Sequence, residues 1–101
     1  MRMQIFKVAR APDDHVDYDE YDSFVCVAVD MEAARRMHPR DTRTWVDGTG
    51  WCWVGDGVPQ GLLDEYHSWT TEIDTLVIER VGVADYSWSE SGVILTSFNA
   101  G

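Results

Sequence analysis

Residues 23–29 read Ser-Phe-Val-Cys-Val-Ala-Val, and this run decides the fold. It contains no charged residue, and valine recurs at every second position from Val25 to Val29. Successive side chains of a strand point to opposite faces, so a strand that is apolar throughout is covered on both faces. We therefore expect residues 23–29 to be a central strand of a sheet. The side chains predicted to be buried are those of Phe24, Val25, Val27 and Val29.

A short helix is expected directly after this strand. Asp30 suits the N-cap position because its carboxylate can accept from the first-turn amides, and Glu32 lies near the positive end of the helix dipole. Residues 32–37 read Glu-Ala-Ala-Arg-Arg-Met and favour a helix. Pro39 ends it, because proline disfavours helical geometry at the residue before it.

Three more strands flank these elements. Residues 3–10 alternate so that Phe6 and Val8 share one face. Residues 76–84 form another strand with a candidate bulge at Gly82, and residues 93–98 form the last. The segment between those two, residues 85–92, is predicted to be a hairpin connection.

The region from about residue 40 to residue 75 is an insertion rich in tryptophan and glycine. Turn residues at 47–50 predict a small hairpin between residues 45–46 and 51–54, and residues 62–67 predict one helical turn. A structureless loop of this length is uncommon inside a domain, so the insertion is expected to carry structure or function.

These elements predict one α+β domain over residues 1–101. Its core is a mainly antiparallel four-stranded sheet with one short helix on a face, and the Trp-rich insertion is added to it. The crossover from the strand at 23–29 through the helix to the strand at 76–84 can align those two strands in parallel.

Charge restricts the classes of partner. The 101 residues include 18 Asp and Glu against 8 Lys and Arg, for a formal net charge of −10. Such a surface repels nucleic acid and anionic membranes and attracts basic surfaces. No apolar run reaches the ~20 residues of a membrane span, and no signal-peptide pattern is visible at the start. We expect a cytoplasmic protein that binds neither nucleic acid nor membrane directly.

The two cysteines lack the spacing of a metal site or a disulfide framework. Both are expected to be free thiols in a reducing compartment. Cys26 lies in the apolar strand and is expected to be buried. Cys52, in a Gly-rich region, is expected to be less protected.

The acids are concentrated before the central strand, where six of the ten residues from 13 to 22 are Asp or Glu. Two tyrosines lie among them, and tyrosine is frequent in binding hot spots. We predict a partner-binding surface on this acidic segment, against the plainer interpretation of a solvated loop. Its residues are Asp13, Asp14, Asp17, Tyr18, Asp19, Glu20, Tyr21 and Asp22.

A divalent cation is a further interpretation of this segment, with Asp13, Asp14, His15 and Asp17 as ligands. The EF-hand pattern fails, because a loop that starts at Asp17 has Asp22 where glycine is needed. We therefore predict no metal.

Motifs for catalysis are missing from the sequence. It has no Gly-x-Ser-x-Gly, no P-loop and no His-Glu-x-x-His, so neither an enzymatic activity nor a cofactor is predicted. Trp45, Trp51 and Trp53 in the insertion are either a stacking or anchoring platform for a ligand or partner, or a satellite core that holds the insertion together.

Two parts of the chain resemble short acidic proteins of phages and prophages. They are residues 19–25 (Asp-Glu-Tyr-Asp-Ser-Phe-Val) followed by 32–39, and the ending at residues 92–101. The resemblance transfers no functional residue, but it implies a context. It implies a non-catalytic, anti-CRISPR-like inhibitor that binds a host protein or nucleoprotein defence complex with a basic surface. The alternative function is a small-ligand or metal-binding accessory module that uses the Trp-rich insertion.

Overall fold

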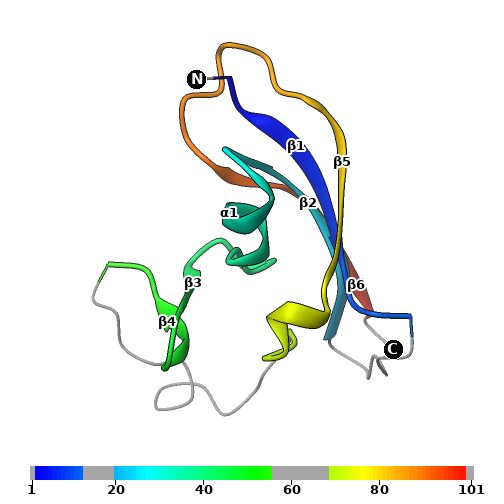
Figure 1. Cartoon of the computed structure of the whole chain (residues 1–101), viewed down its shortest axis with the longest axis vertical. Helices are drawn as coiled ribbons and strands as arrows, with labels where there is room; N and C mark the ends of the chain where they lie inside the picture. Colours follow the sequence, from blue (N-terminus) through cyan, green and yellow to red (C-terminus); the bar gives the residue numbers. More distant parts are fainter. Residues whose placement is uncertain (1, 13–19, 56–68, 100–101) are drawn as a thin grey trace.

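The computed structural model describes residues 2–12, 20–55 and 69–99. A four-stranded sheet carries one short helix on a face, and a small two-stranded hairpin lies beyond that helix (Figure 1). The elements in chain order are β1 (Gln4–Ala9), β2 (Glu20–Ala28), α1 (Met31–Arg35), β3 (Arg43–Val46), β4 (Gly50–Trp53), the 3-10 turn η1 (Ile73–Thr75), β5 (Val77–Val83) and β6 (Gly92–Asn99).

The strand order of the sheet is β5-β1-β2-β6, and every neighbouring pair is antiparallel. The predicted mainly antiparallel α+β architecture is confirmed, and β2 lies inside the sheet as expected. Phe24 and Val27 are buried, whereas Val25 is half-buried. The prediction that Val29 is buried is wrong. β2 ends at Ala28, and the Val29 side chain is 40% exposed.

The prediction that β5 and β6 form a hairpin is also wrong. β5 pairs with β1 and β6 pairs with β2, so these strands form opposite edges of the sheet. Residues 84–91 therefore cross the end of the β1–β2 pair (Figure 1, orange). Arg2 contacts residues 84–91 twice. Its Nε donates to the Ala84 carbonyl at 3.0 Å, and its guanidinium lies 4.3 Å from the centre of the Tyr86 ring.

Two expectations about β5 are confirmed. The register changes between Ile5, opposite Gly82, and Phe6, opposite Arg80, so Val81 is the extra residue of a bulge beside Gly82. β2 and β5 run in the same direction, as the crossover allowed, although β1 lies between them.

The main core lies on the α1 face of the sheet. The predicted cap is confirmed, because Asp30 Oδ1 accepts from the Ala33 amide at 2.8 Å. α1 then packs Ala34 against the sheet. The core residues contributed by β1 and β2 are Phe6, Val8, Phe24, Cys26 and Ala28.

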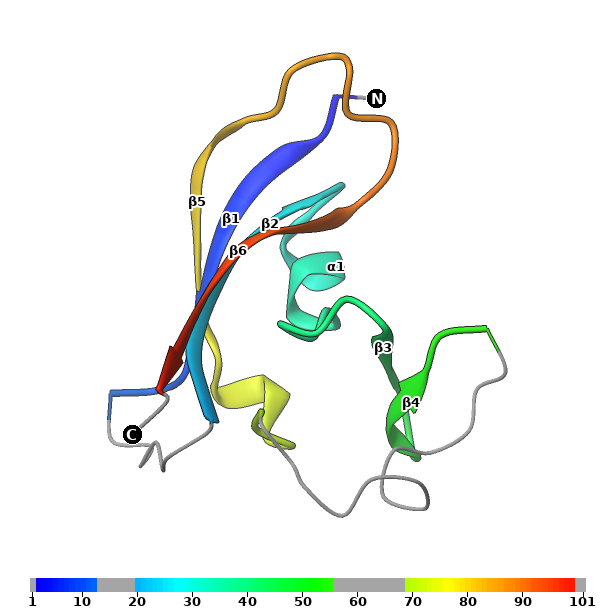
Figure 2. The same cartoon turned by 180° about the vertical axis from the view of Figure 1, so that it is seen from behind.

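The hairpin predicted inside the insertion is confirmed as β3 and β4, in the register Trp45 opposite Trp51. Gly48 and Gly50 have φ of +81° and +102°, which glycine adopts without strain. In both views α1 lies between the sheet and this hairpin (Figures 1 and 2). The helical turn expected at residues 62–67 lies outside the described residues.

Candidate partner-binding surface

The acidic segment joins the two inner strands of the sheet, because β1 ends at Ala9 and β2 begins at Glu20. Glu20, Tyr21 and Asp22 form the start of β2, beside the end of β6. The predicted site residues Asp13, Asp14, Asp17, Tyr18 and Asp19 lie outside the described residues.

The described end of the segment shows two different environments. The Asp22 side chain is exposed, and one of its oxygens accepts from the Ser23 hydroxyl at 3.1 Å. Tyr21 is half-buried and packs against the main core. Asp22 is therefore accessible to a partner, whereas only part of the Tyr21 side chain is. Binding of a partner by these residues stays a prediction.

Arg10 fixes the base of the acidic segment, a role that the sequence analysis missed. Its backbone N–H donates to the Asp22 carbonyl at 3.1 Å, and its Nε donates to the Tyr21 carbonyl at 2.9 Å. Its guanidinium also lies 5.4 Å from the centre of the Trp69 ring. The two carbonyls that follow Glu20 are thus held by one residue at the end of β1.

The tryptophans of the hairpin share one face with Arg43. Trp45 is opposite Trp51, and Arg43 is opposite Trp53, so the four side chains alternate with those of Thr44 and Cys52. Trp51 and Trp53, two residues apart on β4, therefore lie on the same face. Three of the four tryptophans of the insertion that the structure describes lie on this face.

Trp51 belongs to the main core, not to a separate satellite core as one interpretation held. It is 5% exposed, and its Nε1 donates to the Thr70 carbonyl at 2.8 Å. Its ring meets Trp45 edge to face at 5.2 Å and His38 at 5.0 Å. A ligand that stacks on Trp51 would have to displace these rings, so this residue does not provide an open platform.

Trp53 lies at the margin of the hairpin, where Arg43 covers its ring. The Arg43 guanidinium is 3.9 Å from the ring centre, a cation–π contact, and Arg43 is 5% exposed. Trp45 and Trp53 are both half-buried. Anchoring of a ligand or partner by these tryptophans stays a prediction, with Trp45 and Trp53 the more accessible of the three.

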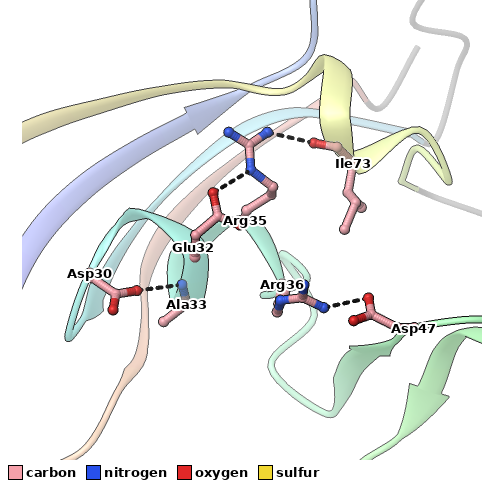
Figure 3. Close-up of polar contacts among 7 residues, drawn as sticks. All are labelled: Asp30, Glu32, Ala33, Arg35, Arg36, Asp47 and Ile73. Carbon is pink, nitrogen blue, oxygen red and sulfur yellow. Dashed lines mark hydrogen bonds and ion pairs between the residues drawn. The ribbon is translucent and has the colours of Figure 1, made fainter.

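Polar contacts connect α1 and the residue that follows it to η1 and to the hairpin turn (Figure 3). Arg35 donates to the Ile73 carbonyl at 2.8 Å and also pairs with Glu32 at 3.4 Å. Arg36 pairs with Asp47 in the hairpin turn at 2.7 Å. The hydrogen bond from Arg36 lowers the pKa of Asp47 below its usual range, but both groups face water, so the pair adds little stability.

Both cysteines are free thiols, as predicted, and both are buried. Burial, with a smaller contribution from the charge of Asp41, raises the pKa of Cys26 to about 12. The thiol therefore stays protonated near neutral pH and is a poor nucleophile. The expectation that Cys52 is less protected is wrong, because its side chain is 1% exposed although glycines lie on both sides of the hairpin strand.

The part of the chain that the structure describes gives no indication of a metal site or of a membrane-spanning helix. No three His, Cys, Asp or Glu side chains gather there as a metal site requires. None of the helices in residues 2–12, 20–55 and 69–99 has the length and apolar character needed to cross a membrane. Comparison with protein families, curated proteins and solved structures finds no match to this chain.

Proposed function

We propose that the protein is a non-catalytic, phage-encoded inhibitor of the anti-CRISPR kind, which binds a host defence complex through an acidic surface. The observation that carries this proposal is the concentration of six carboxylates in the ten residues that lead from the β1–β2 connection into the start of β2. The contact surface is the acidic segment, residues 13–22.

Charge complementarity supports this choice of partner. A defence complex that binds nucleic acid has a basic channel for phosphates, and a row of carboxylates is attracted to the same lysines and arginines. Residues 13–22 contain no lysine or arginine that would compete for those carboxylates. The net charge of −10 also speeds the encounter with a basic surface.

The fixed base of the segment supports the proposal as well. Binding is weakened by every group that must be ordered in the complex, so a contact surface gains affinity when its backbone is already held. Arg10 holds the carbonyls of Tyr21 and Asp22, and Glu20 and Tyr21 pair with Asn99 and Phe98 of β6. The Asp22 carboxylate is thus presented to solvent from a fixed strand.

A capture experiment tests the proposal. The full chain is immobilised, and retention of a purified, RNA-guided defence complex is measured across a salt series. We expect retention to fall as salt rises, because screening weakens attraction between opposite charges. The test variant carries Asp17→Asn, Asp19→Asn, Glu20→Gln and Asp22→Asn, and we expect it to bind about tenfold more weakly or worse, with a smaller salt dependence.

A matched control separates the acidic segment from net charge alone. It carries Glu72→Gln, Asp74→Asn, Glu79→Gln and Glu90→Gln, four exposed acids outside the segment. Both variants lose the same number of charges. Retention of binding by this control supports the segment as the contact surface, and equal loss in the two variants contradicts it.

A further inference from the structure

Residues 84–91, which connect β5 to β6, present two aromatic side chains to solvent. Tyr86 is 78% exposed and Trp88 is 42% exposed. Tyrosine and tryptophan are the residue types that most often dominate the energy of protein–protein contacts. The sequence of residues 85–91, Asp-Tyr-Ser-Trp-Ser-Glu-Ser, has the composition of antibody binding loops, in which large aromatic rings supply contact area and serine supplies adaptable hydrogen bonds.

The backbone of this connection is fixed by hydrogen bonds. The Asp85 carboxylate accepts from the Ser87 amide at 2.9 Å, and the Asp85 carbonyl accepts from the Trp88 amide at 3.0 Å, so these residues form a tight turn. At the start of the connection, the Ala84 amide donates to the Met3 carbonyl at 2.9 Å. A turn that is already ordered loses little conformational freedom when a partner binds. The two aromatic rings are therefore presented from a prepared backbone.

The Tyr86 ring shows which chemical group such a ring binds in this protein. The Arg2 guanidinium lies 4.3 Å from the centre of the ring, a cation–π contact. The same pairing recurs at Trp53 and Trp69, each of which has an arginine of the chain beside its ring. No arginine in the described part of the chain lies over Trp88 in this way. The Trp88 ring can therefore accept an arginine from another molecule.

Charge also favours a cation at Trp88. The connection contains two acids, Asp85 and Glu90, and no lysine or arginine. Hydrogen bonds from Ser87, together with the charge of Arg2, lower the pKa of Asp85, so the Arg2 charge is opposed by a neighbouring carboxylate. Glu90 is exposed and follows Trp88 by two residues. A guanidinium suits this combination better than an ammonium, because it is planar, stacks on aromatic rings and is more weakly hydrated.

We propose that residues 84–91 are a second protein-binding surface, on which Trp88 stacks with an arginine side chain of the partner. This surface lies at the opposite end of β1 from the acidic segment (Figure 1). Ala84 pairs with Met3 just before β1, whereas the acidic segment follows the end of β1 at Ala9. The second surface is thus separate from the one proposed above and does not depend on it.

Nuclear magnetic resonance of the Trp88 indole N–H tests the proposal. The probe is a short peptide of alternating glycine and arginine, added to the full chain. The chain carries four substitutions that keep the acidic segment from competing for the peptide, Asp17→Asn, Asp19→Asn, Glu20→Gln and Asp22→Asn. We expect a saturable shift of the Trp88 signal, which is assigned by its loss in Trp88→Leu. The matched lysine peptide should bind about threefold more weakly or worse.

Two matched variants separate the proposed contact from net charge. Glu90→Gln should weaken binding of the arginine peptide about threefold, whereas Glu79→Gln, at an exposed residue of β5, should leave it unchanged. Equal effects of the two variants overturn the proposal. A Trp88 signal that does not move, or that moves equally with the lysine peptide, overturns it as well. Because the acidic segment is neutralised throughout, these outcomes do not depend on whether the proposed function holds.

Discussion

The indole Nε1 of Trp51 donates a hydrogen bond to the Thr70 carbonyl at 2.8 Å, and this bond joins the hairpin to the segment that leads into η1. The same indole packs edge to face against Trp45 and His38. One side chain thus connects β3, β4, the residue before Pro39 and the segment at 69–70. Together with Trp69 and Ile73, this residue makes the Trp-rich insertion part of the main core.

Replacing Trp51 should destabilise the whole fold. Trp51→Ala removes a large buried ring and should lower the free energy of unfolding by about 3–5 kcal/mol. Trp51→Phe keeps much of the ring but leaves the Thr70 carbonyl without its donor, at a cost of about 1–3 kcal/mol. Urea unfolding measures both values. Trp88→Ala, at a side chain that is 42% exposed, is the control, and an equal loss there would show that Trp51 has no special role.

A substitution at Val27 tests the position of β2 inside the sheet. Its side chain is completely buried, so Val27→Asp places a carboxylate without a partner in the interior. We expect a loss of several kcal/mol, a large part of the ~5–15 kcal/mol that stabilises a small domain. The matched change Val77→Asp on β5, at a side chain 51% exposed, should have a much smaller effect. An unchanged melting temperature for Val27→Asp would contradict the strand order.

The raised pKa of the Cys26 thiol makes the free energy of unfolding depend on pH. The thiol has a pKa of about 12 in the folded protein against 9.0 for the ordinary thiol, so the unfolded chain ionises first as pH rises. The contribution of Cys26 is therefore fully present below pH 9 and is lost progressively between pH 9 and pH 12.

Urea unfolding at pH 8 and pH 10 measures this loss. Wild type should lose about 1 kcal/mol more than Cys26→Ala over that interval, because each pH unit above the unfolded pKa changes the balance by up to about 1.4 kcal/mol. The comparison removes the contribution of tyrosine and lysine titration, which the variant shares. Identical pH dependence in the two proteins would show that Cys26 is not protected.

The elements of the fold were predictable where a local pattern decides them. Phe6 and Val8 alternate with outward-facing residues, Asp30 precedes a helix, and the glycines at 48 and 50 define a tight hairpin. In each case the physical cause lies within a few residues of the element. The sequence could therefore predict the strands, the helix cap and the hairpin.

Strand partners and core membership depend on distant residues, and there the predictions failed. Residues 85–92 have the turn chemistry of a hairpin, but the β1–β2 pair occupies the middle of the sheet, so β5 and β6 are added to opposite edges. Cys52 lies near glycines that indicate an open loop, yet its side chain is 1% exposed, and no local pattern in the sequence indicates this burial. The role of Arg10 at the candidate site was hidden for the same reason, since its acceptors lie eleven and twelve residues away.

Inhibition of a host defence complex is tested most directly by the plating efficiency of a phage on cells whose active CRISPR system targets it. We predict that expression of the chain restores plaques, that the variant neutralised at Asp17, Asp19, Glu20 and Asp22 does not, and that the control neutralised at Glu72, Asp74, Glu79 and Glu90 does. Equal plating with and without the chain would contradict the proposed function. Full restoration by the variant neutralised in the acidic segment would contradict that segment as the contact surface.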